Sequence, residues 1–144
     1  SDELADEAEL LLMFASRAQL MKEKVLDSNL DFILFDRFYD ASIAYQGYGR
    51  NISLDFISSL VSFVNCPAPD ITFLLDISVD DGFSRKVDDV KDRIESSGLD
   101  FFNNVREGYL KVAKSNPERV KVLDASKTIE DVHVEIIEYV NKIL

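Results

Sequence analysis

Short apolar runs alternate with longer amphipathic segments along the chain, and this alternation constrains the fold more than any other feature. Residues 31–36 read DFILFD and residues 71–77 read ITFLLDI, and residues 119–123 (RVKVL) are predicted as a third strand. Continuous apolar runs of this length are typical of strands buried on both faces of a parallel sheet. The segments between them have the apolar spacing of helices. The pattern therefore predicts an α/β fold in which helices flank a parallel sheet.

Helices are expected on both sides of each predicted strand. Ser53 and Thr128 are suited to cap helices that run to about residue 64 and to residue 143. Ser1 or Asp2 is suited to cap the first helix, which is expected to end at about residues 27–29. The other expected helices are a short one ending at 44, one over 79–87 and one over 99–115. A chain of 144 residues fits a single domain, which we expect over residues 1–144.

The composition excludes several classes of protein. Sixteen Lys and Arg against 27 Asp and Glu give a net charge of −11, which disfavours binding to nucleic acid or to an anionic membrane. No apolar run approaches the roughly 20 residues of a membrane helix. The single cysteine, Cys66, excludes an internal disulfide and a cysteine-based zinc site. A lone thiol fits a reducing compartment, so we expect a cytoplasmic protein.

All three predicted strands end in aspartate, at Asp36, Asp76 and Asp124. In parallel α/β sheets, ligands bind outside the carboxyl ends of the strands. Three carboxylates at that edge could hold a metal ion or orient cationic side chains. Alternatively, each aspartate simply caps the turn that follows its strand. The residue pattern leaves both interpretations open, and the ligands of any metal ion stay unknown.

Four segments resemble bacterial thymidylate kinases. Residues 36–50 read DRFYDASIAYQGYGR, and the family shares the order DR, an aromatic or histidine residue, a small hydroxyl residue, AYQG and then a basic residue. Residues 11–19 (LLMFASRAQ) are similar to the thymine-binding helix of the family. Residues 92–109 (DRIESSGLDFFNNVREGY) and 124–135 (DASKTIEDVHVE) are similar to its lid region and to its last strand-to-helix turn. The order matches throughout, so the resemblance covers essentially the whole chain.

The resemblance implies a phosphotransferase with the three-layer α/β fold of P-loop nucleoside triphosphatases. Such an enzyme transfers the γ-phosphoryl group of ATP, with Mg²⁺, to deoxythymidine monophosphate (dTMP) and yields the diphosphate. Members of the family are usually homodimers, and the long first helix could supply part of that interface. Two alternatives are a related deoxynucleoside or deoxynucleotide kinase, and a nucleotide-binding or dimerisation module without catalysis.

Arg37 and Asp36 are the candidate phosphate-site residues. The planar fork of Arg37 suits bidentate contact with a phosphate, and the resemblance implies that it holds the acceptor phosphate of dTMP and is catalytic. Asp36 would order the phosphate-binding elements or the water shell of Mg²⁺. The simpler alternative is a surface arginine that pairs with Asp36 or Asp40.

The candidate base-binding residues on the first helix are Arg17, Met13 and Phe14. The resemblance implies that Arg17 hydrogen-bonds the thymine ring and that an aromatic residue four positions earlier stacks on it. Here that position is Met13, and Phe14 lies three positions before Arg17. One residue turns a helical side chain by about 100°. Either Met13 or Phe14 therefore covers the base, and packing in the core is the alternative for both.

Ser42, Tyr45 and Gln46 match family positions that contact the nucleoside. Ser42 and Gln46 match residues at the base edge, and the glutamine amide offers both a donor and an acceptor to a pyrimidine imide. Tyr45 matches an aromatic residue that lies against the 2′ carbon of the sugar and disfavours ribonucleotides.

The lid is expected at about 85–97 and carries several basic residues. Arg93 is the first choice for a catalytic residue in the lid, and Arg85 is the second. The resemblance places five residues on the ATP side: Arg85, Lys91, Arg93, Ser126 and Lys127. The alternative for the lid residues is an ordinary solvated charged loop.

The sequence contains no phosphate-binding loop of the form GxxxxGK followed by serine or threonine. Backbone N–H groups and the lysine of such a loop bind the ATP phosphates in nucleotide kinases of this class. The residues therefore resemble the part of the fold that lies downstream of this loop and of the first strand. We expect residues 1–144 alone to be inactive.

Overall fold

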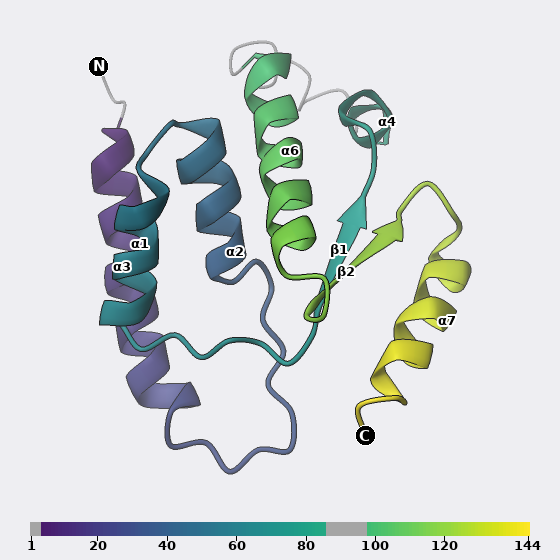
Figure 1. Cartoon of the computed structure of the whole chain (residues 1–144), viewed down its shortest axis with the longest axis horizontal. Helices are drawn as coiled ribbons and strands as arrows, with labels where there is room; N and C mark the ends of the chain where they lie inside the picture. The colour runs from purple at the N-terminus through teal and green to yellow at the C-terminus, as the bar shows by residue number, and fades with distance from the viewer. Residues whose placement is uncertain (1–3, 86–97) are drawn as a thin grey trace. The chain divides into compact units, whose positions relative to one another are not determined.

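The computed structural model describes residues 4–85 and 98–144, which fall into two compact units, Ser1–Ala68 and Pro69–Leu144 (Figure 1). Each unit contains its own set of buried apolar side chains. The lid predicted at about 85–97 lies outside the described residues except for Arg85. The single domain predicted over residues 1–144 stays a prediction.

The first unit begins with a long helix. Helix α1 spans Asp6–Leu20 and continues as a π-helical segment, η1, over Met21–Val25. The expected end near residues 27–29 is close to the observed end. The residue before the helix is Ala5, which offers no side-chain cap. Acidic side chains in the first turn favour the helix start instead, because they interact with the positive end of the helix dipole.

Two further helical stretches complete the first unit. Helix α2, Tyr39–Ser42, continues without a break as the π-helical segment η2, Ile43–Gly49, so the helix extends beyond the predicted end at residue 44. Helix α3 spans Leu54–Phe63, as predicted, and the Oγ atom of its cap Ser53 accepts a hydrogen bond from the backbone N–H of Phe56 at 3.3 Å.

Gly47 lets η2 and α3 pack closely. A Cβ atom at Gly47 would lie 2.5 Å from Cδ2 of Leu54, well inside van der Waals contact. The core of the unit lies between α1 and α3, where Leu10 and Phe14 pack with Ile57 and Val64. The cluster packs the two helices against each other.

The strand predicted over residues 31–36 is absent, and that prediction was wrong. Residues 32–35 are described without strand structure, and the side chains of Phe32 and Leu34 are 59% and 94% exposed. A strand buried on both faces needs hydrogen-bonded neighbours for its backbone. Within the described residues the only sheet contains two strands, and they pair with each other. Residues 32–35 pair with neither of these strands and therefore do not form one themselves.

The second unit contains this sheet. Strand β1 spans Thr72–Asp76 and strand β2 spans Val120–Asp124. The strands are parallel, and their register runs from Thr72 opposite Val120 to Asp76 opposite Asp124. Both predicted strands and their parallel arrangement are confirmed. The two aspartates consequently end at the same edge of the sheet.

Helices flank the two strands (Figure 1). Helix α4 spans Val79–Ser84, helix α6 spans Leu99–Ser115, and helix α7 spans Ile129–Val140. Thr128 caps α7 as predicted, because its Oγ1 atom accepts a hydrogen bond from the backbone N–H of Asp131 at 3.1 Å. No helix among the described residues is long and apolar enough to cross a membrane.

Candidate functional site

A cavity of about 450 Å³ lies in the first unit, between the later turns of α1 and residues 35–38. Part of its wall is apolar and consists of Leu12, Met13, Leu20, Phe35 and Phe38. The polar part of the wall consists of Ser16, Arg17, Asp36 and Arg37. The structure thus brings four predicted substrate residues, Met13, Arg17, Asp36 and Arg37, to one cavity.

Arg17 is held in place on several sides. Its Cζ atom lies 4.6 Å from the ring centroid of Phe14 and 5.6 Å from that of Phe38. One terminal nitrogen donates to Oγ of Ser42 at 3.3 Å, and the other donates a longer bond to the carbonyl oxygen of Phe38 at 3.5 Å. Burial lowers the pKa of Arg17, and the nearby Cys66 opposes this shift. The guanidinium nevertheless stays charged at neutral pH.

Met13 and Phe14 occupy different environments. The Phe14 side chain is 2% exposed and belongs to the core cluster, whereas Met13 is 40% exposed and lines the cavity. The two positions differ by about 100° around the helix, which explains why only one of them reaches the cavity. Of the two candidates for covering a base, Met13 therefore lies at the site, and Phe14 supports Arg17 from the core.

Arg37 has an unusual backbone conformation. Its φ angle is 54°, in the left-handed region that residues other than glycine rarely adopt. Its Cζ atom lies 4.3 Å from the ring centroid of Tyr45, which provides a cation–π contact. Strained residues of this kind occur preferentially at functional sites. The turn and the Tyr45 ring together orient the guanidinium at the cavity wall.

Ser42 and Gln46 are buried, with exposures of 1% and 2%, and neither is among the residues that line the cavity. The Nε2 atom of Gln46 donates a hydrogen bond to Oε1 of Glu9 on α1 at 2.6 Å. The other end of the amide, Oε1 of Gln46, is buried and has no hydrogen-bond partner within the described part of the chain.

In the second unit, the aspartates at the strand ends have partners of their own. The two carboxylate oxygens of Asp76 accept hydrogen bonds from Nε and one terminal nitrogen of Arg106 at 2.7 and 2.8 Å, which raises the pKa of Arg106. Asp124 accepts hydrogen bonds from Oγ and the backbone N–H of Ser126 at 2.6 and 2.9 Å. These bonds lower the pKa of Asp124. Asp124 thus caps the following turn, as one of the two interpretations predicted.

A metal cluster at the strand ends is not supported. Across residues 4–85 and 98–144, no group of three or more His, Cys, Asp or Glu side chains is placed to hold a metal ion. Within the second unit, Asp76 and Asp124 therefore do not belong to such a group.

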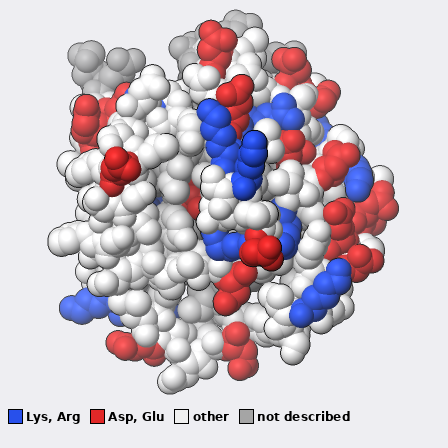
Figure 2. Space-filling model, in the orientation of Figure 1, with Lys and Arg blue, Asp and Glu red and all other residues white. Residues whose placement is uncertain are grey.

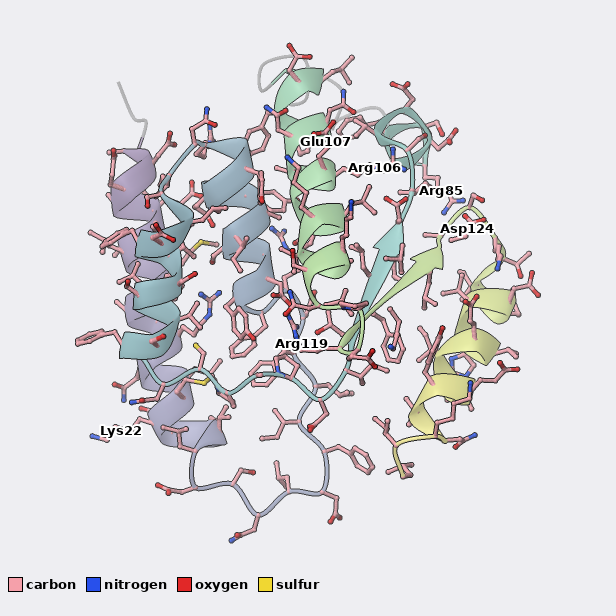
Figure 3. The ribbon with its side chains drawn as sticks, in the orientation of Figure 1. Lys22, Arg85, Arg106, Glu107, Arg119 and Asp124 are labelled. Atoms are coloured by element: carbon pink, nitrogen blue, oxygen red, sulfur yellow. The ribbon has the colours of Figure 1, made fainter. Side chains whose placement is uncertain are left out.

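Arg85 binds the turn that follows β2. Its two terminal nitrogens donate to the backbone carbonyl oxygens of Ala125 and Ser126 at 2.8 and 3.4 Å. Figure 3 shows Arg85 beside Asp124 at the carboxyl ends of the strands. Lys127, in the same turn, forms an ion pair with Glu135 at 3.3 Å. Three of the residues predicted for the ATP side, Arg85, Ser126 and Lys127, are thus close together.

The other predicted ATP-side residues, Lys91 and Arg93, lie outside the described residues. The catalytic roles of Arg93 and Arg85 stay predictions.

Sequence reasoning missed Glu9 and Phe38. Phe38 follows Arg37 directly and supplies both a ring and a carbonyl oxygen to Arg17. Glu9 lies four positions before Met13 and eight before Arg17, so helical spacing alone places it on the same stripe of α1. That spacing was the available signal for Glu9, whereas the contact between Phe38 and Arg17 had none.

Comparison with known proteins identifies the family. The sequence profile of the family described as thymidylate kinase matches residues 1–136. The chain belongs to the thymidylate kinase family. The thymidylate kinase of Kosmotoga olearia is 40% identical over 139 residues, which cover 94% of this chain and 67% of the relative. The thymidylate kinase of Chlorobaculum tepidum is 40% identical over 147 residues, which cover 92% of this chain and 68% of the relative.

A solved structure agrees with this assignment. The crystal structure of thymidylate kinase from Ehrlichia chaffeensis matches with a TM-score of 0.76 at 32% identity, over 98% of this chain and 68% of that one. The chain thus spans about two thirds of the length of these thymidylate kinases. The resemblance, the α/β fold and the assignment to a family of phosphotransferases, all predicted from sequence, are confirmed.

Proposed function

We propose that the cavity in the first unit binds dTMP and that the protein transfers the γ-phosphoryl group of ATP to it, yielding the diphosphate. The observation that carries this proposal is that two arginines, Arg17 and Arg37, line one cavity together with an apolar wall. A nucleoside monophosphate needs such a combination, because its base is largely apolar and its phosphate is anionic. A volume of about 450 Å³ suits a ligand of this size.

Arg37 is proposed to hold the acceptor phosphate. Phosphoryl transfer depends on positioning and charge neutralisation, and a guanidinium fork can bind two phosphate oxygens at once. The contact with the Tyr45 ring supports this role, because it restricts the orientation of the fork before substrate binds. Tyr45 is also proposed to exclude ribonucleotides, as the family resemblance implies.

The cavity offers one carboxylate, that of Asp36, as a ligand for Mg²⁺. Mg²⁺ is commonly held by one or two carboxylates together with substrate phosphates and water. Asp36 is the carboxylate that lines the cavity, so it would help to hold the ion or its water shell. When bound, the ion would neutralise the charge of the transferred phosphoryl group.

Base recognition is proposed for four residues, with Arg17, Ser42 and Gln46 at the base edge and Met13 over the base face. The orphaned Oε1 atom of Gln46 supports this assignment, because thymine carries an N–H group at N3 that could donate to it. Phe14 belongs to the core, so we propose for it a supporting role beneath Arg17.

ATP is proposed to bind through the five residues predicted for its side of the site: Arg85, Lys91, Arg93, Ser126 and Lys127. The bonds from Arg85 to two carbonyl oxygens in the turn after β2 support a role in ordering that turn.

A homodimer and a cytoplasmic location are part of the proposal. Two kinds of observation support them. Leu4, just before helix α1, and Leu11 on that helix are apolar and are 56% and 51% exposed, and α3 carries Phe63 at 83%. In Figure 2 the surface over α1 and α3 is largely uncharged. The free thiol of Cys66 fits a reducing compartment.

The decisive test is an assay of ATP-dependent diphosphate formation from dTMP with the natural full-length protein and its Arg37→Lys variant. Lysine keeps the charge and loses the fork, so turnover is expected to fall by orders of magnitude while the protein stays folded. Wild-type turnover by Arg37→Lys would remove Arg37 from the phosphate site. Binding of dTMP without any turnover by the full-length protein would favour the non-catalytic alternative.

A further inference from the structure

One side-chain contact decides which end of the Gln46 amide is left unpaired. Nε2 of Gln46 donates to Oε1 of Glu9, and Gln46 is 2% exposed. An ionised carboxylate only accepts hydrogen bonds, so the amide end that faces Glu9 must be the NH₂ group. The carbonyl oxygen Oε1 is then the free end, and it has no partner among the residues that the structure describes. A buried polar atom without a partner requires an explanation, and a missing ligand is one.

On α1 the contact lies about one helical turn before Met13, which lines the cavity. Glu9, Met13 and Arg17 follow one another at intervals of four on α1 and therefore share one face of that helix. Arg17 donates to Ser42, and Glu9 accepts from Gln46, which is four positions after Ser42. Two side-chain links thus join α1 to the α2–η2 helix, and Met13, which lines the cavity, lies between them in the sequence of α1.

We propose that Glu9 determines the base selectivity of the site by fixing the orientation of the Gln46 amide. The inference rests on the proposed binding of dTMP. Thymine and uracil carry a hydrogen at N3 and can donate to Oε1 of Gln46. Cytosine has an unprotonated N3, so its lone pair would face the lone pairs of Oε1.

Without an acceptor-only partner, the Gln46 amide could turn over and present its NH₂ group to cytosine. Glu9 is therefore a positioning residue that acts through Gln46, and it does not itself contact the substrate.

The test is a calorimetric measurement of dTMP and dCMP binding to the natural full-length protein and to its Glu9→Gln variant. Glutamine at position 9 has nearly the same size, but it can donate as well as accept, so it permits both orientations of Gln46. We expect the preference for dTMP over dCMP to fall by about tenfold, the effect of one lost hydrogen bond of ordinary strength. Glu7 lies on the same helix and is exposed, so Glu7→Gln is the matched control and should leave the preference unchanged.

Two further variants separate this role from a purely structural one. Glu9→Asp keeps an acceptor-only group and should retain the preference even where both affinities decrease. In a Gln46→Leu background, Glu9→Gln should have no further effect on the preference, because the amide through which it acts is gone. If Glu9→Gln does not fold, Glu9→Ala also removes the acceptor and should show the same tenfold loss.

The outcomes distinguish the two proposals. An unchanged dTMP-to-dCMP ratio in Glu9→Gln, with weakened dTMP binding in Gln46→Leu, overturns the role of Glu9 and leaves the proposed function intact. A wild-type protein that does not bind dTMP overturns both. A reduced ratio in Glu9→Asp as large as that in Glu9→Gln would also contradict the inference, because it would show that an acceptor-only group at position 9 does not preserve the preference.

Discussion

Asp76 and Arg106 form a bidentate ion pair, with two hydrogen bonds of 2.7 and 2.8 Å between the end of β1 and the middle of α6. The side chains are 21% and 39% exposed, respectively. The pair joins the carboxyl end of a strand to the helix that covers it, and its planar geometry fixes the direction of both side chains. Figure 3 shows Arg106 extending from α6 toward the strands.

Asp76→Asn should lower the free energy of unfolding by about 1–2 kcal/mol, because it removes one charge and one of the two strong acceptors of a partly buried pair. The matched control is Glu135→Gln, which removes the more exposed ion pair with Lys127 and should cost less than about 0.5 kcal/mol. Urea unfolding of both variants measures the difference. Equal effects would show that the Asp76 pair has no special contribution.

Met13→Ala and Phe14→Ala should separate binding from stability. Phe14 is almost fully buried in the core, so its truncation should cost roughly 3–5 kcal/mol of unfolding free energy. Met13 lines the cavity and is 40% exposed, so its truncation should mainly raise the KM for dTMP and leave the fold stable. Thermal melts and KM values for dTMP are the measurements. A larger KM effect from a folded Phe14 variant would contradict the assignment.

Gly47→Ala should destabilise the protein despite the better helix propensity of alanine. The new Cβ would lie 2.5 Å from Cδ2 of Leu54, and the required shift should cost about 1–3 kcal/mol. Gly82→Ala, in helix α4, is the control, because its Cβ would lie 3.5 Å from the nearest side-chain atom, an ordinary van der Waals contact. That variant should be neutral or more stable by up to about 1 kcal/mol. Denaturant midpoints decide between these outcomes.

Asp124 should contribute a pH-dependent part of the stability. Hydrogen bonds from Ser126 lower its pKa in the folded state below the ordinary value of 3.8. The stabilisation is therefore fully present above that value and is lost as the pH falls through the folded-state pKa. Melting temperatures of wild type and Asp124→Asn should differ at about pH 7 and converge in acid. A difference that grows on acidification would show that the sign is wrong.

Residues 1–144 alone should not phosphorylate dTMP. The sequence offers no glycine-rich loop ending in Lys-Ser or Lys-Thr, so the ATP phosphates lack a preorganised set of backbone donors. Assays of this chain beside the natural full-length protein test the expectation. Robust turnover by residues 1–144 would show that phosphate binding is built from residues present here, and Gly47–Arg50 would be the first segment to examine.

Helix starts could be predicted from the sequence, because they depend on residues that are close together in the chain. The caps Ser53 and Thr128 start their helices where expected, because capping depends on a few neighbouring residues. The run at 31–36 failed as a strand because strand formation depends on partners elsewhere, and apolar composition does not supply them. Four residues that line the cavity, Met13, Arg17, Asp36 and Arg37, were predicted from the resemblance to the family. The contact between Glu9 and Gln46 was missed, because it joins positions 37 residues apart.

The left-handed backbone of Arg37 affects the outcome of directed evolution for stability. Glycine adopts a φ of 54° without steric cost, so Arg37→Gly should relieve about 1 kcal/mol of backbone strain. A selection for thermal tolerance alone would then favour loss of the side chain that the proposed reaction needs. Screens for hardier variants of this protein should therefore hold position 37 constant, or they will enrich well-folded molecules that no longer work.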